Sequence, residues 1–169
     1  KVIANTASLG RPVSVAVRDR LVANGWDQDL ADYYAIAGLT LTVDADFENS
    51  KKEPVYQIML GCREKDHSAI IQGVEGVKVA TSWNRAADVI PNSGGKGSAV
   101  AHILDYYSLD PSQAMAFGDN QNDMEMLQAV GTGVAMGNAT DGLKAVADAI
   151  CAPVSQDGIY HYLEEKGLI

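Results

Sequence analysis

The densest group of polar side chains in the sequence follows a short apolar run. Residues 114–117 (AMAF) predict a buried strand, and residues 118–123 (GDNQND) come directly after it. Asp119 then lies at the turn from strand to helix, and Asn122 and Asp123 lie in the first helical turn, where offsets of three and four residues bring side chains to one side. A helix N-terminus suits an anion, and adjacent carboxylates suit a hard dication such as Mg²⁺.

A simpler interpretation of this acidic turn is that one residue caps the helix. Asp119 and Asn120 are both of the type preferred at such a position. A cap needs one residue, whereas two carboxylates and an amide converge here. The spacing therefore favours a functional site without excluding the cap.

A second polar cluster contains a lysine between glycines, in residues 93–98 (SGGKGS). Glycines allow the backbone to approach a ligand closely, and Lys96 could meet a phosphate as a point charge. The loop is not a Walker A motif, because Ile90 stands where a glycine is needed and Gly97 where Ser or Thr is needed. Taken alone, the loop is equally typical of an exposed turn.

The elements that must position these residues alternate regularly after Gly97. Strands and helices of about ten residues in alternation predict parallel β-α units. Unbroken apolar strands fit burial on both faces of the sheet. The predicted strands are residues 114–117, 133–136 and 149–152, and the predicted helices are 98–107, 122–130, 140–147 and 157–166.

The first part of the chain has a different character, with short β-rich runs and two helical patterns. It predicts an antiparallel sheet with helices on one face. The expected helices are residues 11–24 and 64–72, and the expected strands are 39–43, 55–60, 77–81 and 87–90. We therefore predict an α/β protein of two modules, residues 1–85 and residues 86–169.

Composition narrows the range of partners. Thirteen basic and 22 acidic residues leave a net charge of −9, which disfavours nucleic acid and anionic membrane surfaces. The longest apolar stretch, residues 35–43, is far shorter than the ~20 residues that cross a bilayer. Cys62 and Cys151 are too few and too scattered for a disulfide framework or a thiolate metal site. A cytoplasmic location is expected.

Three blocks of sequence together resemble the Cof-type hydrolases of the haloacid dehalogenase superfamily, which are Mg²⁺-dependent phosphatases. The blocks are residues 88–98 (DVIPNSGGKGS), 116–127 (AFGDNQNDMEML) and 133–139 (GVAMGNA), and Asp157-Gly158-Ile159 adds a fourth similarity. The resemblance covers residues 54–169. It implies the C-terminal half of a Rossmann-like core with a parallel sheet, and an α+β cap with an antiparallel sheet that sets substrate specificity.

The resemblance also implies roles for individual residues. Lys96, Asp119 and Asp123 would be catalytic: Lys96 would balance charge on the nucleophile and on the phosphoryl group. Asp119 and Asp123 would serve the metal, Asp123 by steadying Lys96 or a metal-bound water. Asn122 would contact the phosphate or its bound water. The implied reaction transfers a phosphoryl group from a small phosphorylated metabolite, such as a sugar phosphate, to an aspartate and then to water.

The family's first motif, Asp-x-Asp-x-Thr, has no good match. Asp44-Ala45-Asp46 lacks the following threonine and lies too close to Lys96, so we expect a polar loop there. Residues 8–12 (SLGRP) only faintly resemble the second motif. We therefore expect a truncated chain that is inactive alone and self-associates through an incomplete core sheet. A phosphomutase and an inactive module that binds a phosphate ligand or a protein remain alternatives.

Overall fold

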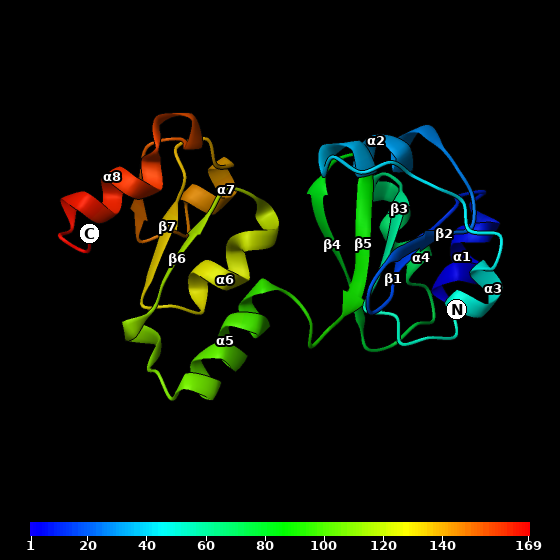
Figure 1. Cartoon of the computed structure of the whole chain (residues 1–169), viewed down its shortest axis with the longest axis horizontal. Helices are drawn as coiled ribbons and strands as arrows, with labels where there is room; N and C mark the ends of the chain where they lie inside the picture. Colours follow the sequence, from blue (N-terminus) through cyan, green and yellow to red (C-terminus); the bar gives the residue numbers. More distant parts are fainter. The chain divides into compact units, whose positions relative to one another are not determined.

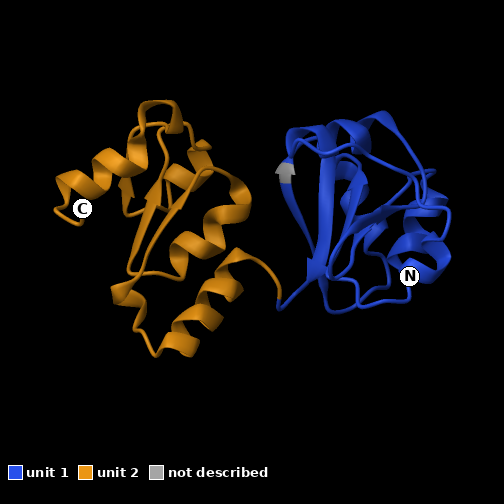
Figure 2. Cartoon of the chain, viewed as in Figure 1, with its two compact units in different colours: residues 1–93 blue, residues 94–169 orange. Residues whose placement is uncertain are grey.

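The computed structural model describes residues 1–81 and 83–169, and these form two compact units, Lys1–Ser93 and Gly94–Ile169 (Figure 2). The division lies between Ser93 and Gly94 rather than after residue 85. The reason is that strand β5 (Ala86–Pro91) pairs with β3 (Gln57–Gly61) and β4 (Val77–Trp83) and so belongs to the first unit. The roles of the units as cap and core stay predictions.

The first unit is built on a five-stranded antiparallel sheet (Figure 1). Its strands lie in the order β2-β1-β3-β5-β4, with β1 at Ser14–Ala16 and β2 at Leu21–Ala23. In the centre, Ile58 of β3 faces both Val15 of β1 and Val89 of β5. β-Branched residues suit this pleated, buried surface. The expected antiparallel sheet is confirmed.

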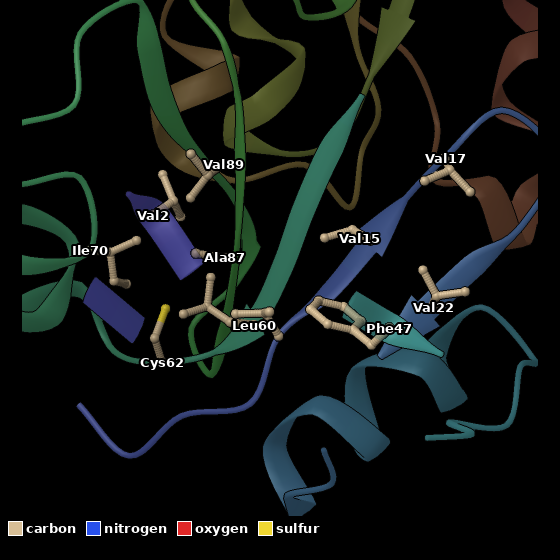
Figure 3. Close-up of a cluster of buried hydrophobic side chains, with 11 residues drawn as sticks. Val2, Val15, Val17, Val22, Phe47, Leu60, Cys62, Ile70, Ala87 and Val89 are labelled. Atoms are coloured by element: carbon tan, nitrogen blue, oxygen red, sulfur yellow. The ribbon is translucent and has the colours of Figure 1, made fainter. Parts of the chain in front are cut away.

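Helices cover both faces of this sheet, so the expectation of helices on one face is wrong. On one face, Leu60 of β3 belongs to a buried cluster with Val2 of α1 (Val2–Ser8), Phe47 of α3 (Phe47–Ser50) and Ile70 of α4 (His67–Ile70) (Figure 3). On the other face, Met59 packs in a cluster that α2 (Gln28–Ile36) contributes to. Successive strand residues point to opposite faces, and both faces of β3 are apolar, so each needs a cover.

Two local predictions in the first unit are also wrong. Residues 11–24 form the β1–β2 hairpin instead of a helix, and Val13, Val15 and Val17 are all buried with a period of two. Residues 39–43 form no strand beyond a single bridge from Val43 to Ala23. The other predicted elements of this unit are found close to their expected places, including the helical stretch that a 3₁₀ turn begins at Glu64–Asp66. Helices α1, α2 and α3 were not predicted.

The second unit contains a three-stranded parallel sheet, as the alternating pattern predicted. Its order is β6-β7-β8, which leaves one side of β6 without a strand neighbour in the described chain. The expected self-association stays a prediction.

The helices and strands of the second unit have the following bounds: α5 Lys96–Tyr107, β6 Met115–Gly118, α6 Met124–Gln128, β7 Thr132–Ala135, α7 Asp141–Lys144, β8 Ala149–Ile150 and α8 Gly158–Glu165, with 3₁₀ turns at Pro111–Gln113, Gln121–Asp123 and Val154–Gln156.

Helices α6 and α8 cover opposite faces of this sheet. A Cβ at Gly133 of β7 would lie 2.8 Å from the Cβ of Leu127, so α6 packs closely on that face. On the other face, Phe117 of β6 meets Tyr162 of α8 edge to face, with ring centroids 5.7 Å apart. Among the described residues, no helix combines the length and the apolar character that crossing a membrane requires.

Candidate active site

Lys96 is the first residue of α5, and the packing of that helix on α6 sets its position. Gly95 precedes it as the N-cap with a φ of 123°, a conformation that favours glycine. Gly97 follows it, and a Cβ there would lie 2.7 Å from the backbone oxygen of Glu125 in α6. The two glycines therefore allow the start of α5 to approach the start of α6.

The result of this approach is an ion pair between Lys96 and Asp123. The Lys96 ammonium donates to Oδ1 of Asp123, whose side chain is only 4% exposed, while the lysine side chain is 50% exposed. Oδ2 of the same carboxylate accepts hydrogen bonds from the backbone N–H groups of Asp119, at 2.9 Å, and Asn120, at 3.1 Å. Both oxygens of Asp123 are therefore engaged.

These contacts keep Asp123 ionised although it is buried. Burial acts to raise the pKa of the carboxyl group, but the hydrogen bond from Lys96 and those from the two backbone N–H groups outweigh it, and the net effect lowers the pKa of Asp123. A buried charge is tolerated when it is paired and hydrogen-bonded in this way. Asp123 is thus a fixed negative charge that holds the lysine.

Asp119 follows strand β6 directly, and its side chain is exposed. Its Oδ2 accepts a hydrogen bond from Nδ2 of Asn138 at 3.3 Å. The helix-capping role falls to Asn120, whose side chain accepts from the backbone N–H of Gln121 at 2.8 Å. The cap interpretation is therefore correct for Asn120 and does not account for Asp119.

Asn122 is half-buried on the same turn, and its side-chain oxygen lacks a hydrogen-bond partner in the described part of the chain. This oxygen, Oδ1, is itself buried. A buried polar atom without a partner is costly and uncommon in folded proteins. Such an atom is ready to accept from a donor or to contact a cation.

The oxygen atoms of this turn fit one side of a Mg²⁺ site. The exposed carboxylate of Asp119 and the unpartnered amide oxygen of Asn122 are hard ligands of the kind Mg²⁺ prefers. Asp123 suits direct ligation less well, since both of its oxygens are already used. No group of three His, Cys, Asp or Glu side chains that could hold a metal occurs among the described residues.

Sequence reasoning missed one residue of the site, Asn138. It lies within the resembling block of residues 133–139, and the sequence predicted no role for it in the site. Strands β6 and β7 are parallel neighbours, with Gly118 opposite Ala135, and so both chains leave the sheet at the same edge. A polar residue shortly after the end of the neighbouring strand was the signal that could have identified it.

The two weak matches to missing motifs have structural roles in the first unit. Asp44 accepts from the backbone N–H of Asp46 and from Oγ of Ser50, both at 2.9 Å, and thereby stabilises the turn that begins α3. Ser8 lies at the end of α1 and donates to the carbonyl of Ala4. The expected polar loop at residues 44–46 agrees with these contacts.

Comparison with known proteins finds relatives that are named as phosphatases. The chain is 36% identical over 116 residues to the putative phosphatase YkrA of Bacillus subtilis strain 168, covering 68% of this chain and 44% of YkrA. It is 31% identical over 147 residues to the 5-amino-6-(5-phospho-D-ribitylamino)uracil phosphatase YitU of the same strain, covering 82% of this chain and 54% of YitU. The chain thus spans about half the length of these curated relatives.

The fold is shared as well. The structure of BT1666 from Bacteroides thetaiotaomicron, described among phosphatases of the haloalkanoate superfamily, matches with a TM-score of 0.85 and 25% identity, covering 99% of this chain and 63% of BT1666. Residues 30–163 match the family of haloacid dehalogenase-like hydrolases. Since that match extends over most of the sequence and includes every residue of the acidic turn, the chain belongs to the haloacid dehalogenase-like hydrolases, in their Cof-type branch.

Proposed function

We propose that this chain supplies one half of the active site of a Mg²⁺-dependent phosphatase for small phosphorylated metabolites. The observation that carries the proposal is the half-exposed lysine held by a buried carboxylate next to an exposed one: Lys96, Asp123 and Asp119. A fixed cation beside an exposed carboxylate is an arrangement suited to a doubly charged phosphoryl group and a divalent metal.

Each residue has a distinct task in this proposal. The Lys96 ammonium has three N–H donors, and one of them goes to Asp123, which leaves donors for phosphoryl oxygens. Asp123 is a positioning residue that orients Lys96 and holds the backbone of the turn. Asp119 offers a carboxylate oxygen to Mg²⁺, and the bound ion would neutralise charge on the transferring group. Asn122 contacts the phosphate, as the resemblance implies, and its unpartnered Oδ1 is a further oxygen beside the metal position.

The nucleophile is proposed to lie outside these 169 residues. The two aspartates that imitate the first motif, Asp44 and Asp46, are occupied in the turn before α3. The reaction would form a bond from an aspartate oxygen to phosphorus while the substrate's oxygen–phosphorus bond breaks, and water would then release phosphate from the aspartyl group. On this proposal the chain alone is inactive.

The substrate class rests on the relatives. YitU is named for a phosphorylated ribitylaminouracil, a small metabolite that carries a phosphate ester. We extend to this protein only the shared chemistry, a phosphate monoester of a small polar molecule. The first unit, as a cap, would select among such esters.

The test uses the complete reading frame that contains this chain. The purified protein is given Mg²⁺ and a panel of sugar phosphates, nucleoside monophosphates and pyridoxal phosphate, and released phosphate is measured. We expect hydrolysis of at least one ester, and we expect Lys96→Ala and Asp119→Asn to lower kcat/KM by about 10²–10³-fold. Lys166→Ala, a change of an exposed lysine in the same unit, is the matched control and should leave turnover unchanged.

Three other results would each contradict a part of the proposal. Phosphate release by the 169-residue chain alone, at the rate of the complete protein, would refute an external nucleophile. Conversion of a sugar phosphate into its isomer, followed by ³¹P NMR, would identify a mutase instead of a hydrolase. Binding of phosphate esters without any turnover in the complete protein would favour the inactive binding module.

A further inference from the structure

Asn138 lies where the loops after two neighbouring strands run side by side. Strand β7 ends at Ala135, opposite Gly118 at the end of β6, and the backbone N–H of Met136 donates to the carbonyl of Gly118 at 2.8 Å. Two residues after Met136, the chain places the amide of Asn138 against the carboxylate of Asp119. The contact therefore joins the loop after β7 to the loop after β6, which continues into the 3₁₀ turn that ends at Asp123.

The side-chain amide of Asn138 makes two hydrogen bonds, one as a donor and one as an acceptor. Nδ2 donates to Oδ2 of Asp119 at 3.3 Å, and Oδ1 accepts from the backbone N–H of Val154 at 3.0 Å. An ionised carboxylate only accepts and a backbone N–H only donates, so a single orientation of the amide satisfies both. Neither aspartate nor leucine, which are similar in size, could serve both partners.

The backbone of Asp119 is fixed by other contacts, which leaves its side chain as the part that Asn138 controls. The N–H of Asp119 donates to Asp123, and its carbonyl accepts from the N–H of Thr140 at 3.1 Å. Among the described residues, the one hydrogen bond to the Asp119 carboxylate comes from Asn138. An exposed carboxylate without such a donor would sample several rotamers.

We infer that Asn138 is a positioning residue for Asp119, which it orients while anchored through Val154 to the 3₁₀ turn Val154–Gln156 that precedes α8. The inference rests on the proposed function, because that proposal makes Asp119 a metal ligand. The hydrogen bond between Asn138 and Asp119 is observed independently of it. Partners that orient a metal ligand typically contribute about 10-fold or more to metal affinity. Asn138 is thus assigned a role in the site through its hydrogen bond to Asp119.

The contact is tested first without metal, on the ¹⁵N-labelled chain. Asp119→Ala removes the acceptor, so the side-chain NH₂ resonances of Asn138 should shift. Asn138→Ala removes the acceptor of the Val154 N–H, so the Val154 amide should exchange faster with solvent. Asn138→Asp keeps an oxygen for Val154 and should preserve its protection. Unchanged Asn138 resonances in Asp119→Ala would overturn the inference, whatever the metal result.

The role toward the metal is then tested with Mn²⁺ alone as a paramagnetic probe. Broadening of the Asp119 and Asn122 amide resonances should need about tenfold more Mn²⁺ in Asn138→Ala than in the parent chain. Thr140→Ala is the matched control: it shortens an exposed side chain in the same loop, whereas Thr140 contacts Asp119 through its backbone. Equal Mn²⁺ dependence in Asn138→Ala and the parent would refute the positioning role.

The two proposals fail in distinguishable ways. If the complete protein hydrolyses no phosphate ester while Asn138 and Asp119 remain coupled in the NMR experiment, the proposed function is wrong and the contact stands. If hydrolysis is found but Asn138→Ala changes neither the resonances nor the Mn²⁺ dependence, the positioning role alone is refuted.

Discussion

Lys96 and Asp123 form an ion pair in which one partner is half exposed and the other is almost completely buried. The buried carboxylate also accepts two backbone hydrogen bonds from the turn after β6. One side chain therefore stabilises the turn and orients the lysine. The lysine remains accessible because its partner, and not the lysine itself, lies inside the fold.

Replacing Asp123 should destabilise the second unit more than replacing an exposed aspartate. Asp123→Ala leaves the N–H groups of Asp119 and Asn120 without their acceptor and Lys96 without its partner, which we expect to cost about 2–3 kcal/mol. Amide hydrogen exchange in β6 and β7 measures this loss. Asp141→Ala, an exposed change in the first turn of α7, is the control. Equal protection in the two variants would contradict the prediction.

Two helical glycines of the second unit should respond in opposite ways to alanine. A Cβ at Gly97 would meet backbone atoms of Glu125 at 2.7–2.8 Å, so Gly97→Ala should cost about 1–3 kcal/mol through overpacking. A Cβ at Gly142 would meet only the side-chain oxygen of Gln121, at 3.3 Å, so Gly142→Ala should be neutral or stabilise by up to about 1 kcal/mol.

Circular dichroism and hydrogen exchange can measure both glycine variants. Tryptophan fluorescence serves as the internal control, because Trp26 and Trp83 both belong to the first unit. That signal should be the same in both variants and in the parent chain. A Gly97→Ala chain as stable as Gly142→Ala would show that α5 can move away from α6 at little cost.

The first unit should lose stability in acid through Asp29. Hydrogen bonds from Arg63, and then from Arg85, outweigh burial and lower the pKa of Asp29 from 3.8 to about 2. Because the pKa is lower in the folded state, the stabilisation is complete above about pH 4 and disappears as the pH falls through about 2. The shift corresponds to about 2 kcal/mol.

The acid prediction is checked by urea unfolding followed by tryptophan fluorescence between pH 5 and about pH 2, within the range of the Asp29 shift. Asp29→Asn should be less stable at neutral pH and should show a shallower decline toward low pH. Asp19→Asn, which changes an exposed aspartate of the same unit, should follow the parent. If the free energy of unfolding of Asp29→Asn fell toward low pH as steeply as that of the parent chain, another carboxyl group would be responsible for the loss of stability in acid.

The aspartates that imitate a nucleophile motif should prove dispensable for chemistry. Asp44 is bonded to the backbone of Asp46 and to Ser50, so Asp44→Ala should loosen the start of α3 and lower the stability of the first unit slightly. In the complete protein, Asp44→Asn together with Asp46→Asn should leave phosphate release unchanged. Abolished turnover in a variant that remains folded would instead identify these residues as the nucleophile pair.

The sequence by itself was sufficient to predict the strands and helices of the second unit and the local grouping of polar residues in its candidate site. The strand, turn and helix around Asp119 are set by neighbouring residues, and the alternation that follows Gly97 indicates parallel β-α units. Its resemblance to Cof-type hydrolases pointed to Lys96 as well. Local spacing was enough because Asp119, Asn122 and Asp123 lie within one turn of chain.

The tertiary structure decided what depends on partners distant in sequence. Residues 11–24 carry an apolar pattern compatible with a helix or a hairpin, and pairing of β1 with β3 selects the hairpin. Asn138 meets Asp119 only because β6 and β7 are parallel neighbours. The physical reason is the same in both cases: the energy of burying an apolar strand, or of satisfying an amide, depends on a partner that local sequence does not contain.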